Sequence, residues 1–136
     1  MDDARHTFVE HTSEVELRLD AASPAALFIE AGRALAGLML GEVTGEPTVT
    51  ERVKVTAPDR AALLAAWIDE LIFRAEIRKA VFTEFSVVRI DERELEAELG
   101  GIAEPVLKTA VKAATFHDLR VAEEHGRWVA TVVLDV

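Results

Sequence analysis

The chain has 136 residues, with 25 Asp and Glu against 15 Lys and Arg, a formal net charge of -10 at pH 7, and no cysteine. These numbers exclude a disulfide scaffold, a thiolate metal site and a cysteine nucleophile, and they disfavour direct binding to a nucleic-acid backbone, which needs concentrated Lys and Arg. No apolar run approaches the roughly 20 residues of a membrane span. The start of the chain is acidic, unlike a signal peptide. We therefore expect one cytoplasmic domain over residues 1–136, with no membrane contact and no sequence-specific nucleic-acid binding.

The first part of the chain predicts a strand followed by a helix. The strand is indicated by three apolar residues that alternate with polar ones: Val15, Leu17 and Leu19. Ser23 followed by Pro24 is a typical helix start, because Ser caps the free N–H groups and Pro suits the first helical position. Apolar residues then recur at helical spacing until Gly41, where we expect the helix to end.

A second strand and a second helix follow. The strand is expected over residues 49–55, with an irregularity near Arg52 because the apolar spacing widens there. The helix is expected from residues 58–59 to about Lys79, with Glu70 and Arg74 paired one turn apart on its surface.

The remaining sequence predicts two hairpins. One turns at residues 91–93, and the other turns at residues 124–126 to join 113–122 to 127–136. The order of strand, helix, strand, helix and four strands favours an α+β fold of mostly antiparallel β-sheet layers with two packed helices. Half of the net charge lies in residues 91–104, which form either a solvated strand face or a docking surface for a basic partner.

Four segments, taken in order, resemble the archease family. They are His-Thr-Ser-Glu-Val at 11–15, Trp-Ile-Asp-Glu-Leu-Ile-Phe at 67–73, Val-Lys-Ala-Ala-Thr-Phe-His-Asp at 111–118 and Trp-Val-Ala-Thr-Val-Val-Leu-Asp-Val at 128–136. Each motif alone is weak, but together they span nearly the whole chain from about Phe8. The resemblance implies a single archease-like domain.

The resemblance also implies a function. Archeases are accessory proteins of the RtcB-type RNA ligase, which joins RNA ends in tRNA splicing or RNA repair. They promote guanylylation of the ligase's active-site histidine by GTP and help the ligase turn over repeatedly. By this resemblance the chain is a cofactor-like activator and not an enzyme, and its partner is the ligase protein.

The family carries a metal site, usually described as calcium, at the two chain ends. In this sequence the matching residues are Glu14, Asp135 and Val136. Glu14 stands where the family usually has Asp, a change that the flexible coordination of calcium tolerates better than octahedral magnesium does. Physically, Asp135 lies beside the terminal carboxylate, and two such charges repel unless a cation neutralises them. The other interpretation is an exposed, frayed chain end.

Further candidate residues lie near these motifs. Lys112 matches a family lysine that is important for ligase activation, although a lysine there could simply keep a strand end soluble. Possible supporting residues are His11, Thr115 and His117: His11 to orient Glu14 or to cap the strand, Thr115 as an ordinary strand residue, and His117 as a group that titrates or binds metal. Phe116 stands where the family usually has Tyr.

Two other functions compete with the activator. One is a small metal-dependent phosphoester hydrolase that uses Glu14 and Asp135 as ligands and His117 as base, although no nucleophile motif or glycine-rich phosphate loop supports it. The other is a generic chaperone, which the lack of a large exposed apolar run argues against. As an activator, the chain would dock its acidic, metal-bearing end against the basic cleft of the ligase.

Overall fold

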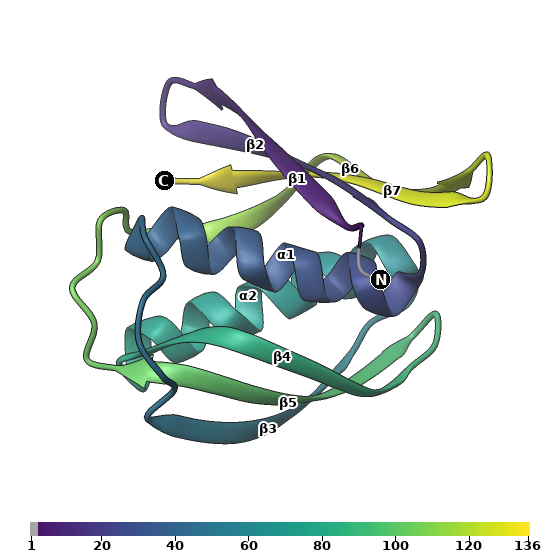
Figure 1. Ribbon diagram of the computed structural model, residues 1–136. Helices are drawn as coiled ribbons and strands as arrows, with labels where there is room; N and C mark the ends of the chain where they lie inside the picture. Colours follow the sequence, from purple (N-terminus) through teal and green to yellow (C-terminus); the bar gives the residue numbers. More distant parts are fainter. Residues whose placement is uncertain (1–2) are drawn as a thin grey trace.

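In the computed structural model, which describes residues 3–136, two antiparallel sheets enclose two helices (Figure 1). The four-stranded sheet has the order β1-β2-β7-β6 and consists of β1 (Arg5–His11), β2 (Glu14–Ala21), β6 (Ala113–Glu124) and β7 (Arg127–Asp135). The three-stranded sheet has the order β3-β5-β4 and consists of β3 (Val49–Thr56), β4 (Ala80–Ile90) and β5 (Glu94–Ala103). The helices between them are α1 (Pro24–Leu40) and α2 (Arg60–Ile77). The predicted α+β fold with antiparallel layers and two helices is confirmed.

Both helices begin where side-chain oxygens can accept hydrogen bonds from otherwise free backbone N–H groups. The Ser23 hydroxyl accepts from the backbone N–H of Ala26 at 3.1 Å, and the Asp59 carboxylate accepts from that of Ala62 at 2.8 Å. The chain leaves α1 at Gly41, whose φ of 76° is easily adopted only without a side chain. Among residues 3–136, no helix combines the length and apolar character that crossing a membrane requires.

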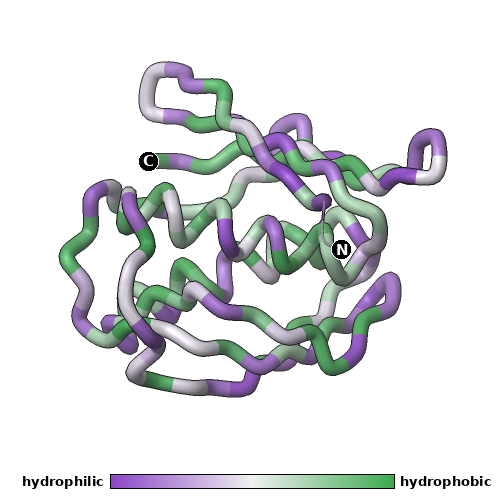
Figure 2. The backbone as a smooth tube through the Cα atoms, viewed as in Figure 1, coloured by the Kyte–Doolittle hydropathy of each residue, from purple (hydrophilic) through white to green (hydrophobic). Residues whose placement is uncertain are grey.

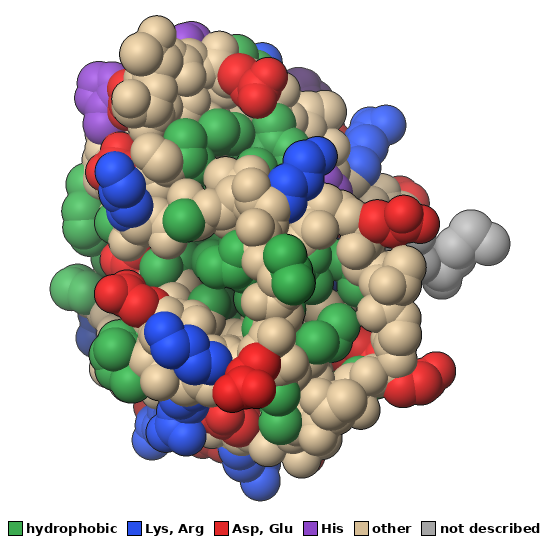
Figure 3. Space-filling model, turned by 90° about the vertical axis from the view of Figure 1, so that its left-hand side faces the viewer, with side chains coloured by type: hydrophobic (Ala, Val, Ile, Leu, Met, Phe, Trp, Pro, Cys, Tyr) green, Lys and Arg blue, Asp and Glu red, His purple; other side chains and the backbone are tan. Residues whose placement is uncertain are grey.

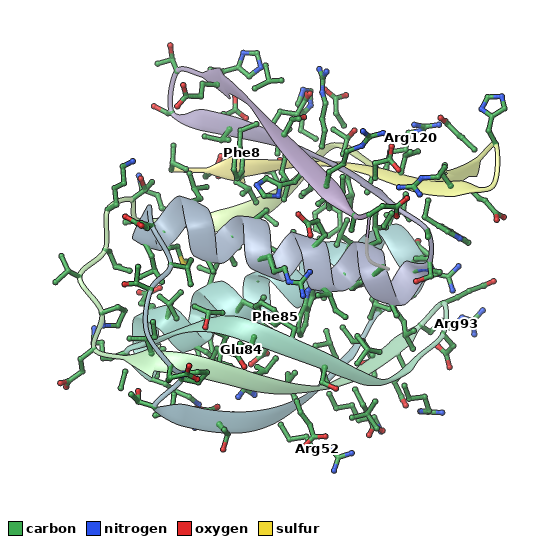
Figure 4. The ribbon with its side chains drawn as sticks, viewed as in Figure 1. Phe8, Arg52, Glu84, Phe85, Arg93 and Arg120 are labelled. Atoms are coloured by element: carbon green, nitrogen blue, oxygen red, sulfur yellow. The ribbon has the colours of Figure 1, made fainter. Side chains whose placement is uncertain are left out.

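Trp67 on α2 occupies the centre of the apolar core. Its side chain is fully buried, and its indole N–H donates to the backbone carbonyl of Phe28 on α1 at 2.8 Å. Phe85 points from β4 toward the helices and meets the Trp67 ring edge-on at 5.8 Å (Figure 4). The Phe85 ring also lies close above Gly32, where a Cβ atom would be 2.7 Å from it. The most hydrophobic residues accordingly lie between the two sheets, and the residues at the hairpin tips are mostly hydrophilic (Figure 2).

The sequence prediction missed β1, the edge strand at the start of the chain. Its inward positions include His6, which weakens the apolar alternation that signals a strand. The structure supplies a partner for this polar side chain, since His6 Nδ1 lies 2.7 Å from Oε2 of the buried Glu30 on α1. A polar pair between β1 and α1 therefore occupies an inward position at which an apolar contact would be usual.

The prediction of an irregularity near Arg52 is wrong, because β3 pairs with β5 in continuous register from Val49 to Thr56. The gap between the apolar residues Val49 and Val53 arises because Glu51 occupies the inward position between them. Arg74 on α2 binds this carboxylate, and Arg78 lies 3.6 Å from it. The predicted Glu70–Arg74 pair forms as well, at 2.8 Å. The register shifts occur instead in β4, between 82 and 84 and between 87 and 89, and in β6 between 115 and 120.

The acidic outer row of β5 is flanked by basic residues on both neighbouring strands. Glu94 lies 3.4 Å from Lys54 and contacts Arg89, while Glu96 lies 3.9 Å from Arg52 and 4.0 Å from Arg89. Arg52 points away from the helices (Figure 4). These cross-strand pairs favour the interpretation of residues 91–104 as a solvated strand face over that of an acidic docking surface.

Candidate functional site

One end of the four-stranded sheet brings together residues from both ends of the chain. In the strand registers, His11 on β1 lies opposite Glu14 on β2, Glu14 lies opposite Asp135 on β7, and Asp135 lies opposite Ala113 on β6. Directly opposed residues of antiparallel strands point to the same face of a sheet. Because the next residue, Val15, faces the core, Glu14 and Asp135 both project from the outer face.

The last residues of the chain are fixed by backbone hydrogen bonds. The N–H of Val136 donates to the carbonyl of Ser13 in the β1–β2 turn at 3.1 Å. The N–H of Lys112 donates to the carbonyl of Asp135 at 2.8 Å. Val136 therefore lies beside the residue that precedes Glu14, so Val136, Glu14 and Asp135 share one small region. These hydrogen bonds favour a fixed site over the exposed, frayed end.

The electrostatics of this region suit a cation. Glu14 and Asp135 are half-buried, and neither has an ion-pair partner among residues 3–136. Like charges at directly opposed strand positions destabilise a sheet unless something neutralises them. The donors are all oxygens, which suit calcium, magnesium or manganese. Across the described chain, no three His, Asp or Glu side chains group closely enough to hold a metal ion, so main-chain oxygens or water would have to complete such a site.

We call the opposed residues Glu14 and Asp135 the outer row. The other predicted site residues on the β6 side lie at different distances from this row. Lys112 is exposed and immediately precedes Ala113. Thr115 lies opposite Val133 and so occupies the next outward position along β6 and β7 from Asp135. His117 falls in the unpaired part of β6, where its Nε2 lies 3.2 Å from the Asp118 carboxylate. The structure thus brings Lys112 and Thr115 beside the row, but it shows no contact between His117 and the row.

Asp69 on α2 is a neighbour that sequence reasoning did not single out. Its carboxylate accepts a hydrogen bond from the backbone N–H of Ala114 at 2.8 Å, which ties α2 to the start of β6. Partial burial raises the pKa of this carboxyl above its ordinary value of 3.8, and the hydrogen bond from Ala114 opposes that rise. The sequence signal that could have identified Asp69 is an acidic residue within the mainly apolar segment 67–73. Its hydrogen-bond partner Ala114, however, lies 45 residues away in the sequence.

The raised pKa of Asp69 predicts a pH-dependent effect of Asp69→Asn. The folded chain keeps the carboxyl proton to a higher pH than the unfolded chain does, so this group's contribution to stability falls as the pH rises through that interval. Asparagine keeps the acceptor oxygen and does not titrate. We expect the variant to gain stability relative to wild type between about pH 3 and neutrality, by less than about 1 kcal/mol because the side chain is partly exposed.

Urea unfolding across this pH range measures the effect. Glu92→Gln, which removes an exposed carboxylate in the β4–β5 turn, is the matched control. A difference between Asp69→Asn and wild type that does not change with pH would contradict the prediction.

Known proteins resemble this chain over nearly its whole length. Residues 6–136 match the model of the Archease protein family (MTH1598/TM1083). The chain is 35% identical to the protein named archease from Methanopyrus kandleri over 140 residues, which cover 94% of this chain and 96% of that protein.

Two solved structures also match the fold. The solution structure of Protein 1598 from Methanobacterium thermoautotrophicum gives a TM-score of 0.78 at 27% identity, covering 96% of this chain and 98% of the other. A crystal structure from Thermotoga maritima, described as an archease and possible chaperone, gives a TM-score of 0.67 at 20% identity, covering 94% of each chain.

Proposed function

Because the chain belongs to the archease family, we propose that it is an accessory protein of an RtcB-type RNA ligase that acts in tRNA splicing or RNA repair. In this role it binds the ligase, promotes guanylylation of the ligase histidine by GTP and supports repeated turnover. The observation that carries the proposal is the fixed outer row of Glu14 and Asp135 beside exposed Lys112. The name of the Thermotoga maritima protein, a possible chaperone, also describes a protein that acts on another protein.

We propose that Glu14, Asp135 and a main-chain oxygen of Val136 hold a divalent cation, calcium being the best fit. Their oxygens suit a hard cation, and the longer side chain of Glu14 suits a metal with flexible geometry. A bound cation supplies positive charge that offsets the repulsion between the two opposed carboxylates. Thr115, one position along the outer face, and His11, opposite Glu14, are the nearest candidates for orienting these ligands.

Lys112 is the residue that we propose to act on the ligase complex. Its backbone is fixed by the hydrogen bond to Asp135, while its side chain is exposed and has no ion-pair partner among residues 3–136. A fixed stem and a free ammonium group suit contact with a nucleotide phosphate or a ligase carboxylate. The bond-forming chemistry stays with the ligase, so in this proposal the chain is not itself an enzyme.

The direct test mixes purified ligase, GTP and Mn²⁺ with and without the chain and follows formation of the guanylylated ligase. We expect the wild-type chain to accelerate guanylylation and to permit more than one ligation per ligase molecule. Lys112→Ala should lose most of the acceleration, whereas Lys54→Ala on the opposite sheet should keep it. Acceleration by neither wild type nor control, at any ratio to the ligase, would refute the proposed function.

The hydrolase alternative needs a base beside the carboxylates. His117 was the sequence candidate, but it pairs with Asp118 in the unpaired part of β6. This placement favours the activator. Turnover of a phosphoester by the isolated chain, lost in Asp135→Asn, would instead support the hydrolase.

A further inference from the structure

A groove with a volume of about 780 Å³ opens at the same end of the molecule as the Glu14–Asp135 row. It lies between the last turns of α2 and the loop formed by residues 104–112. Buried apolar side chains form its floor: Met39, Ile72 and Val111. Leu107, Pro105 and Ala110 belong to the 104–112 loop and line the groove on that side. Figure 3 views this end of the molecule and shows hydrophobic side chains gathered in its middle, with charged groups around them.

Large apolar side chains are also exposed beside this groove. Leu107, in its wall, is 43% exposed, and its neighbour Val106 is 91% exposed. Ile77, which follows the groove residue Glu76 at the end of α2, is 61% exposed. An exposed apolar patch rimmed by polar groups is typical of a surface that binds another molecule.

The rim of the groove carries charges of both signs. Glu76, Lys79, Glu104 and Lys112 line it, and within residues 3–136 none of these four side chains has an ion-pair partner. On the outer face of β5, in contrast, Glu94 and Glu96 are paired with basic residues. Two carboxylates on the rim disfavour a polyanion as the occupant of the groove, while the two lysines favour an acidic group. The complement of this rim is a peptide that carries both a basic and an acidic side chain next to apolar ones.

The 104–112 loop is fixed by backbone hydrogen bonds to α1, to β7 and to the connection between α2 and β4. The N–H of Glu104 donates to the carbonyl of Lys79 at 2.6 Å, and that of Lys108 donates to the carbonyl of Met39 at 2.7 Å. At the other end of the loop, the backbone N–H of Lys112 donates to the backbone carbonyl of Asp135 at 2.8 Å. The groove wall is therefore largely preformed, and Lys112 lines the groove and lies beside the candidate metal site.

We propose that this groove binds an apolar peptide segment of the ligase that carries one basic and one acidic side chain. This inference rests on the proposed function, since it identifies the surface, beside the proposed metal site, by which the chain binds the ligase. The ligase segment places a large apolar side chain on Met39, Ile72 and Val111. Its basic group faces Glu76 and Glu104, and its acidic group faces Lys79 and Lys112.

The test compares Leu107→Asp with Val88→Asp. Both side chains are exposed to a similar extent, 43% and 46%, but Val88 lies on β4, away from the groove. The dissociation constant for the ligase is measured by biolayer interferometry, and guanylylation is measured separately. Loss of a central apolar contact typically weakens an interface by about tenfold or more, so we expect this for Leu107→Asp and no change for Val88→Asp. Equal urea midpoints show that both variants are folded.

The two readouts separate the inference from the proposed function. If wild type binds and activates the ligase and Leu107→Asp does so equally well, the groove inference is wrong and the function stands. If wild type binds without activating and Leu107→Asp loses binding, the groove stands and the activator role fails. No binding by wild type refutes both. Self-association of wild type that Leu107→Asp abolishes, seen by sedimentation equilibrium, would identify a second copy as the occupant and overturn the inference.

A second variant tests the charges of the occupant. Glu76→Gln should weaken ligase binding several-fold and make it less dependent on salt, because it removes one of the two carboxylates that face the basic group. Glu92→Gln in the β4–β5 turn removes the same charge far from the groove and should have no effect. Equal binding by the two variants would overturn the assignment of a basic group to the segment.

Discussion

Asp135→Asn is expected to weaken calcium binding by at least about 100-fold, because loss of a partner outside the metal's own ligands already costs about 10–100-fold. The same substitution removes the repulsion between opposed carboxylates on β2 and β7. In the absence of calcium the variant should therefore be slightly more stable than wild type, by about 0.2–1 kcal/mol. In saturating calcium the order should reverse, since a ligand at 100 times its Kd stabilises a protein by about 2.7 kcal/mol.

Calorimetric titration and thermal unfolding with and without calcium measure these two effects. Glu14→Gln should behave like Asp135→Asn, because the two residues face each other across the strands. Glu10→Gln is the matched control, an exposed glutamate on β1 outside the Glu14–Asp135 row. If Asp135→Asn binds calcium as wild type does, this end of the sheet is not the metal site.

Trp67→Ala is expected to lower the free energy of unfolding by about 3–5 kcal/mol, the range for removing a large buried aromatic side chain. Trp67 is fully buried between the two sheets, and its ring packs nearly perpendicular to that of Phe85 from one of them. The substitution also removes the indole hydrogen bond to the carbonyl of Phe28, which joins the two helices. The loss therefore falls on the helical layer between the two sheets.

Urea unfolding followed by circular dichroism measures the loss. Trp67→Phe should cost less, since it keeps most of the apolar volume and removes only the indole N–H and part of the ring system. Phe73→Ala, a truncation of a 51% exposed aromatic on the same helix, should change stability by no more than about 0.5 kcal/mol. A loss below about 1 kcal/mol for Trp67→Ala would contradict the central role of this residue.

The parts of the fold that the sequence predicts well depend on local signals. The Ser23 cap and the Gly41 end of α1 are visible within a few residues, and the predicted turns at 91–93 and 124–126 separate alternating strands. The structure places the second turn at 125–126, because Glu124 still pairs with Arg127. β1 could not be found in this way, because His6 occupies an inward position and its partner Glu30 lies on α1. Glu51 misled the prediction of β3 for the same reason, since Arg74 neutralises it from α2.

The candidate site shows the same limit. The resemblance supplied Glu14, Asp135 and Lys112 as a set, but only the register of β2 and β7 shows that the two acids lie directly opposite each other. The groove was invisible in the sequence, because its lining comes from α1, α2 and the 104–112 loop. The role of Asp69 in tying α2 to β6 likewise became visible only from its hydrogen bond with Ala114 in the folded chain. Pairings between distant segments, and not residue types, were the missing information.

The hydrogen bond from the Lys112 N–H to the Asp135 carbonyl makes one wall of the groove continuous with the strand that carries a proposed calcium ligand. Occupancy of the two sites should then be thermodynamically linked. Linkage between binding equilibria is reciprocal, so any factor by which calcium tightens ligase binding is also the factor by which the ligase tightens calcium binding. If calcium tightens ligase binding, the complex therefore holds the ion more tightly than the free chain does, by that same factor.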